Sequence, residues 1–138
     1  LIFSCPENSY TSNYRQEVLN LVNAERAKYG LTALEMGDDA LTAAAQTRAE
    51  EISVVNSHVR PDGSKCFTVL KDYGVTDTPT GENAAWGSVS PEEVVNAWMN
   101  SEGHRANILD PEARAMGVGY YYNSSSTWGH QWIQLFTK

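Results

Sequence analysis

Cysteine, positive charge and long apolar segments are all scarce in this chain of 138 residues. Two cysteines are too few for a small scaffold held together by disulfide bonds. Ten Lys and Arg residues against 17 Asp and Glu residues give a formal charge of −7, which opposes binding to nucleic acid or to anionic lipid. No apolar run is long enough to cross a membrane, so we do not expect a membrane-spanning protein.

The length suits a single domain, which would bury roughly two-thirds of the surface that the unfolded chain exposes. The first eight residues carry no periodic apolar pattern, and Thr11, Ser12 or Asn13 can cap a first helix. We therefore expect an N-terminal arm over residues 1–13, one domain over residues 14–138, and a monomer. A signal peptide has been removed or was never present, and other domains can precede this segment.

The two cysteines lie far apart, Cys5 in the arm and Cys66 in a polar loop. Nothing beside either one is typical of catalysis or metal binding, so we predict a disulfide bond that ties down the arm. Such a bond implies an oxidising compartment, and hence a secreted or cell-surface protein. Two unrelated free thiols are the alternative.

Apolar residues at helical spacing predict a first helix that runs to about Tyr29 and stops at Gly30, and a second over about residues 40–54. The residues of the first helix expected to face the core are Tyr14, Val18, Leu21, Val22 and Tyr29. Those of the second are Leu41, Ala44, Ala45, Arg48, Ala49 and Ile52. The small alanines would let a neighbouring layer approach the second helix closely.

One charged residue, Arg48, lies inside the apolar stripe of the second helix. A buried charge needs a partner, and Glu25 or Glu51 can provide one. We interpret this pairing as structural.

The segment from Ser90 is predicted to form a helix, since Ser90 suits the N-cap and Glu93 completes a capping box. Its core face consists of Val94, Val95, Ala97 and Trp98. We expect this helix to break at Gly103, because glycine takes the left-handed conformation that ends many helices. His104 and Arg105 would then lie at a fixed corner past the break; an ordinary helix C-terminus is the alternative.

A rigid turn is predicted at residues 61–63, because proline presets φ and glycine accepts positive φ in Pro-Asp-Gly. His58 directly precedes this turn, although a histidine at a helix exit is more often a surface residue than a functional one. A short helix over about residues 67–73 should end at Gly74, and an exposed loop over residues 75–80 should follow.

Between Gly81 and Gly87, the chain places Glu82 and Asn83 close to Trp86. Few purely structural reasons put these residue types together between two glycines, so the segment is a candidate functional one. The alternative is a passage from loop to core in which Trp86 packs and Glu82 is solvated.

Two strands are predicted over residues 116–122 and 128–136, with a hairpin over residues 123–127. Ile133 and Leu135 share one face of the second strand. Its other face carries Trp128, His130, Trp132, Gln134 and Phe136. Because both faces hold large apolar residues, we expect a sheet covered by helices on both sides.

Several motifs in this order resemble the CAP superfamily of cysteine-rich secretory proteins, antigen 5 and pathogenesis-related proteins, in its bacterial secreted form. They are Leu21-Val-Asn-Ala-Glu-Arg26, His58-x-x-Pro-Asp-Gly63, Gly81-Glu-Asn83, Trp98-Met-Asn-Ser-x-Gly-His-Arg-x-Asn-Ile-Leu109, Gly117-Val-Gly119 and Trp132-x-Gln-x-Phe136. The resemblance spans about residues 14–138. It implies an α/β fold, a three-layer α-β-α sandwich with a central, mainly antiparallel sheet, and a shallow central cavity.

Members of that family line the cavity with two histidines and two acidic residues. By motif, His58 and His104 resemble the histidines and Glu82 resembles one acid. The second acidic position matches Ser101, so the resemblance implies a triad unless Glu102 substitutes.

Two imidazoles and a carboxylate can bind Zn²⁺ or another divalent cation and leave one position open. The same three groups can instead form a hydrogen-bonded cluster without metal. They come from three separate segments, which favours a weak or absent metal over a permanent one. Strand alternation adds Gln134 as a further polar residue of the cavity.

We therefore expect a secreted module that binds an unknown lipid, sterol or protein partner, rather than an enzyme. The alternative is a metal-dependent hydrolase or protease with Glu82 as general base on a metal-bound water. No nucleophile–base pair is evident, because Ser57 beside His58 and Ser101 near His104 are sequence neighbours, which seldom meet in triad geometry.

Overall fold

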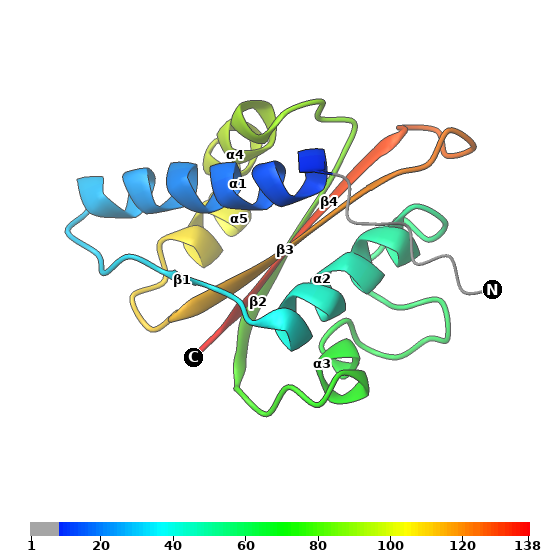
Figure 1. Ribbon diagram of the computed structural model, residues 1–138, viewed down its shortest axis with the longest axis horizontal. Coiled ribbons are helices and arrows are strands. Elements are labelled where there is room, and N and C mark those ends of the chain that lie inside the picture. The colour runs from blue at the N-terminus through cyan, green and yellow to red at the C-terminus, as the bar shows by residue number, and fades with distance from the viewer. Residues whose placement is uncertain (1–8) are drawn as a thin grey trace.

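The structure is a computed structural model that describes residues 9–138. It forms three layers, with a sheet between two groups of helices (Figure 1). The described helices are α1 (Ser9–Lys28), α2 (Asp39–Ile52), α3 (Thr68–Asp72), α4 (Pro91–Met99) and α5 (Glu102–Ile108). The described strands are β1 (Glu35–Met36), β2 (Pro79–Trp86), β3 (Ala115–Tyr122) and β4 (His130–Thr137). No helix among the described residues is long and apolar enough to cross a membrane.

The four described strands form one sheet in the order β1-β3-β4-β2. The β3–β4 and β2–β4 pairs are antiparallel, and only the short β1 pairs in parallel with β3. Helices α1, α4 and α5 lie on one side of the strands, and α2 and α3 on the other (Figure 1). The predicted three-layer sandwich with a mainly antiparallel sheet is confirmed.

The side chains on the two faces of β4 belong to two separate hydrophobic cores, as the alternation of side chains along a strand predicts. Trp132 and Phe136 pack with α1 and α4, whereas Ile133 and Leu135 pack with α2 and α3. All four side chains are almost completely buried. Burial on both faces makes the sheet the centre of the fold.

Helix α2 approaches β3 more closely than a side chain at residue 117 or 119 would allow. Its six buried residues are those predicted, including Arg48. Two glycines of β3 lie beneath it: a Cβ atom on Gly117 would come within 2.7 Å of the Leu41 carbonyl oxygen, and one on Gly119 would collide with the Ala45 carbonyl oxygen. The alanine face of α2 therefore rests directly on backbone.

Both ends of α1 differ from the prediction. The helix begins at Ser9, so residues 9–13 belong to it rather than to an arm. It ends at Lys28, and Tyr29 is 61% exposed instead of buried. The expected stop is present, because Gly30 has a φ of +70°.

A buried arginine at the end of α1 escaped the prediction. Arg26 is completely buried and lies four residues after the buried Val22, on the same helix face. Its guanidinium donates hydrogen bonds to the carbonyl oxygens of Thr32, Ile108 and Asp110. These bonds fasten α1 to the end of α5.

The predicted break at Gly103 is wrong. The capping of α4 is as expected, with the Ser90 hydroxyl accepting from the Glu93 N–H, although Ala97 is exposed. However, α4 ends at Met99, and Ser101 takes the N-cap position of a new helix, α5, which contains Gly103. The chain therefore turns before the glycine, and the Ser101 hydroxyl contacts His104 Nδ1 instead of capping a backbone N–H of α5.

Residues 79–86 form strand β2, and not the passage from loop to core that was the alternative for this segment. Residues 81–84 are buried without interruption, and the alternation that marks a half-exposed strand is absent because both faces are covered. As an edge strand, β2 has carbonyl groups that no strand pairs. The Trp98 indole N–H donates to the Ala84 carbonyl and the Asn107 amide to the Glu82 carbonyl, so α4 and α5 cover this edge.

Candidate functional site

A buried ion pair between Arg48 and Glu82 lies at the centre of the site. The Arg48 Nε atom donates to Glu82 Oε2 at 2.8 Å, and Nη2 donates to Oε1 at 3.0 Å. The two side chains are 0% and 1% exposed. A two-bond arrangement of this kind fixes the orientation of the carboxylate as well as its charge.

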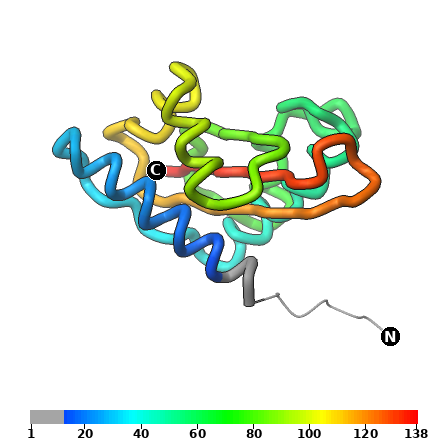
Figure 2. The backbone as a smooth tube through the Cα atoms, turned by 90° about the horizontal axis from the view of Figure 1, so that it is seen from above, coloured from blue at the N-terminus to red at the C-terminus, as the bar shows by residue number. Residues whose placement is uncertain are grey.

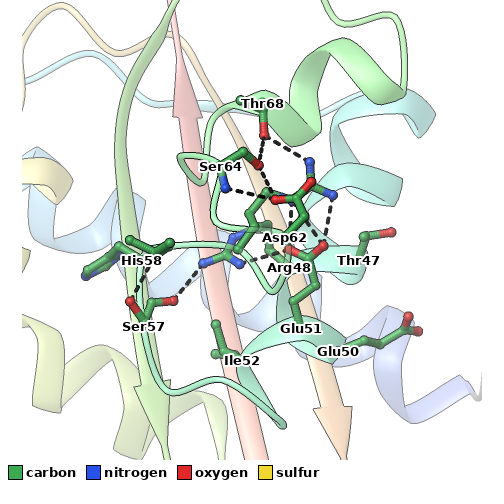
Figure 3. Close-up of polar contacts among 12 residues, drawn as sticks. Thr47, Arg48, Glu50, Glu51, Ile52, Ser57, His58, Asp62, Ser64 and Thr68 are labelled. Atoms are coloured by element: carbon green, nitrogen blue, oxygen red, sulfur yellow. Dashed lines mark hydrogen bonds and ion pairs between the residues drawn. The ribbon is translucent and has the colours of Figure 1, made fainter.

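His58 is the part of this cluster that reaches the surface. Its Nδ1 atom lies 2.8 Å from Glu82 Oε1, while its side chain is 57% exposed. The Arg48 Nη2 atom also donates to the Ser57 carbonyl, which holds the segment that carries the histidine (Figure 3). The predicted turn follows, with Gly63 at a φ of +87° and its N–H bonded to the Arg60 carbonyl.

The ion pairs extend from Arg48 through Glu51 to Arg60 and Asp72. Glu51 accepts from both arginines, and Arg60 also donates to Asp72 at 2.8 Å and to the Thr68 hydroxyl. Although burial raises it, the pKa of Glu51 is held below its ordinary value by hydrogen bonds from Arg60 and Arg48. This network ties α2, the His58 loop and α3 together.

His104 lies apart from the other two predicted residues. Its Nδ1 atom contacts the Ser101 hydroxyl at 2.8 Å, and no hydrogen bond among the described residues joins it to His58 or Glu82. Burial lowers the pKa of His104, and the nearby charge of His58 lowers it further. The structure therefore brings His58 and Glu82 into contact, and relates His104 to His58 through electrostatics.

Gln134 is completely buried and bonded on the α5 side of β2. Its carbonyl accepts from the Asn83 amide at 3.0 Å, and its own amide donates to the Met116 sulfur. Asn83 also donates to the His104 carbonyl and accepts from Asn107 at 2.8 Å. Glu82 and Asn83 follow one another in β2 and thus lie on opposite faces of the sheet, with Glu82 towards α2 and Asn83 towards α5.

The sequence reasoning missed the roles of Asn83 and Asn107, although both lie in motifs that it had singled out. Gly81 gives a further clue, because a Cβ atom there would come within 2.5 Å of Asn107 Oδ1. Glycine before Glu-Asn therefore leaves room for the Asn107 side chain.

Cys66 is a buried thiol near this network. It is 8% exposed, and burial together with the charge of Glu82 raises its pKa to about 11. Its expected partner, Cys5, lies outside the described residues, so the disulfide bond stays a prediction. A thiol with so high a pKa is a poor nucleophile at neutral pH.

The residues of the proposed triad do not fit a metal ion. No group of three or more His, Cys, Asp or Glu side chains within residues 9–138 is placed to hold one. Both oxygens of Glu82 already accept hydrogen bonds, from Arg48 and His58. A carboxylate paired with a buried arginine is also a weak ligand, because its charge is already balanced.

The lowered pKa of His104 predicts a loss of stability in mild acid. Because the folded state favours the neutral ring, its contribution is fully present above the unfolded value of about 6.5 and is lost as pH falls through the folded value. An NMR titration should show His104 half-protonated below pH 6.5, and His58→Ala should raise that midpoint. A midpoint at or above 6.5 would contradict the burial and charge described here.

The chain belongs to the CAP, or cysteine-rich secretory protein, family. The model of this family matches residues 19–136, which include His58, His104 and the whole sheet apart from its last residue. Proteins of this family are typically extracellular.

Two relatives come from Bacillus subtilis. The protein YkwD is 42% identical over 127 residues, which are 91% of this chain and 49% of YkwD. The membrane protein YlbC is 33% identical over 106 residues, which are 75% of this chain and 30% of YlbC. The chain thus spans about half the length of the first relative and less of the second.

Solved structures share the fold. An extracellular protein of Bacillus anthracis with an SCP domain superposes with a TM-score of 0.81 at 25% identity, covering 93% of this chain and 41% of that one. An outer surface protein of Borrelia burgdorferi superposes with a TM-score of 0.73 at 24% identity, covering 89% of this chain and 90% of that one. The second likeness concerns the fold alone.

Proposed function

We propose that this domain acts outside the cell as a binding module rather than as a hydrolase. The engagement of Glu82 carries the proposal: Arg48 and His58 occupy both of its carboxylate oxygens. A general base must reach the proton that it removes, either directly or through one water. Using Glu82 as a base would first require a buried ion pair to be broken.

An apolar groove beside α3 supplies the place for a ligand. It has a volume of about 580 Å³, within the range of small-molecule sites. The apolar part of its lining comes from Phe67, Leu70 and Val75, and the charged residues Lys65, Lys71 and Asp77 also line it. An apolar wall with two cations against one carboxylate suits an amphipathic anion such as a fatty acid.

The ion network gives this groove a fixed wall. Arg60 joins Glu51 of α2 to Thr68 and Asp72 of α3, and α3 forms one side of the groove. A pre-formed site costs less ordering on binding than a flexible one. On this proposal, the cluster around Glu82 supports binding by holding α3 in place.

His58 and His104 are our proposed contacts for a polar group of a protein partner, with Glu82 and Gln134 behind them. The exposed His58 ring is held by its contact with the buried Glu82 carboxylate. Binding of a partner to this ring would therefore cost little side-chain entropy. Secretion or attachment at the cell surface is part of the same proposal, and the extracellular relative from B. anthracis supports it.

Palmitate should bind saturably, and a Lys65→Ala, Lys71→Ala double variant should bind it about five- to tenfold more weakly because the carboxylate loses two cations. Isothermal titration calorimetry measures both affinities. Methyl palmitate, which has no charge, should bind wild type and the double variant equally.

Lys28→Ala provides a matched control, since Lys28 is exposed on α1 and pairs only with Glu25 among the described residues. It should leave palmitate affinity unchanged. The proposal fails if palmitate does not bind to wild type, or if the groove variant and the control variant have the same affinity.

A further inference from the structure

A second pocket lies at the other side of α2, between its C-terminal end and the β3–β4 hairpin. Its volume is about 560 Å³. The end of α2 and the hairpin lie at the same end of the molecule in both views (Figures 1 and 2). A hydrogen bond from the Asn123 amide to the Ser53 hydroxyl at 3.3 Å joins the two elements.

The lining of this pocket is polar but carries no charge. Hydroxyl and amide groups come from Ser53, Asn56, Asn123, Ser125 and Thr127, and no Asp, Glu, Lys or Arg residue contributes. Such groups both donate and accept hydrogen bonds, as the hydroxyl groups of a ligand require. In a chain of charge −7, an uncharged pocket favours a neutral ligand over an anionic one.

Trp128 forms an aromatic wall of the pocket and is 56% exposed. The indole N–H groups of Trp86, Trp98 and Trp132 each donate to a backbone carbonyl. The indole N–H of Trp128 has no such partner among the described residues. A ligand can therefore stack on the exposed ring and can also accept a hydrogen bond from its unpaired N–H.

The hairpin holds this ring in a defined place. Asn123 accepts from the Ser125 and Ser126 N–H groups, and the Ser126 hydroxyl accepts from the Gly129 N–H. Behind the ring, a Cβ atom on Gly87 would lie 3.6 Å from the Trp128 side chain. The loop is thus fastened by its own hydrogen bonds, and Gly87 lies close to the ring.

We propose that this pocket binds a neutral oligosaccharide. The C–H face of a pyranose ring would stack on Trp128, while its hydroxyl groups would bond to the amides of Asn56 and Asn123 and to the Ser125 hydroxyl. A proline-rich peptide also stacks on tryptophan, but such peptides dock in grooves lined by several aromatic side chains. Here Trp128 is the only aromatic residue lining the pocket within the described chain.

NMR titration with chitotriose, cellotriose and maltotriose tests the proposal. At least one of these sugars should shift the indole N–H resonance of Trp128 saturably and leave those of Trp86, Trp98 and Trp132 in place. Trp128→Ala should lower the affinity about tenfold, because the stacking surface is lost. Trp128→Phe should recover part of that affinity.

Tyr29→Ala is the matched control, since Tyr29 is 61% exposed just after α1, whose C-terminal end lies opposite the hairpin (Figure 1). It should bind the sugar as wild type does. The proposal is overturned if none of the three sugars shifts Trp128 at millimolar concentration, if Trp128→Ala keeps full affinity, or if a polyproline peptide shifts Trp128 more strongly than every sugar. These outcomes are independent of palmitate binding beside α3.

Discussion

Replacing Arg48 with methionine is expected to lower the free energy of unfolding by about 3–5 kcal/mol. The substitution leaves the Glu82 carboxylate buried, with only His58 as a partner. It also removes one of the two arginines that bond Glu51. Urea denaturation measures the change, and Lys28→Met, which breaks an exposed pair, should cost less than about 1 kcal/mol.

A double variant separates the effect of the two charges from the effect of the volume that the two side chains fill. Arg48→Met combined with Glu82→Met removes both charges, and replacing a buried pair by apolar groups is often close to neutral. The double variant should therefore be more stable than Arg48→Met alone. If the single substitution costs no more than Lys28→Met, the Arg48–Glu82 pair is not the support described here.

Gly119→Ala is expected to lower the free energy of unfolding by about 3 kcal/mol or more. The added methyl group would meet the Ala45 carbonyl oxygen and the backbone of Gln46. Backbone in the middle of a helix cannot move aside like the end of a flexible side chain, so α2 would have to lift from the sheet. Thermal and urea denaturation would both report the loss.

Gly103→Ala is the matched control for this glycine. It lies in α5 without a positive φ, and a Cβ atom there would meet nothing within 4 Å. Alanine should raise the free energy of unfolding by about 0.5–1 kcal/mol, because glycine is a poor helix former. A large loss of stability in Gly103→Ala would support the predicted helix stop at that residue. A small loss of stability in Gly119→Ala would contradict the close approach of α2 to β3.

Local sequence patterns predicted correctly the elements that have one apolar face and one exposed face. All six buried residues of α2 follow from helical spacing, and the capping of α4 follows from Ser90 and Glu93. The same reasoning missed β2, because a strand covered on both faces shows no alternation. It also misplaced the turn, which lies between the end of α4 at Met99 and the start of α5 at Glu102 rather than at Gly103.

The site was only partly visible in the sequence. Of the three residues that the resemblance singled out, His58 contacts Glu82, whereas His104 contacts Ser101. The stripe position of Arg48 indicated a buried charge, and its pairing with Glu51 is confirmed, whereas Glu25 pairs with Lys28. The main partner, Glu82, lies 34 residues away, and helical spacing carries no information on contacts between elements so distant in sequence.

The most direct test of a binding role is a crystal structure of the protein grown with both palmitate and zinc chloride. Our account predicts a palmitate chain in the groove beside α3, with its carboxylate near Lys65 or Lys71. It also predicts that Glu82 keeps its two hydrogen bonds with Arg48. A zinc ion held jointly by His58, Glu82 and His104, with the Arg48 pair broken, would contradict it.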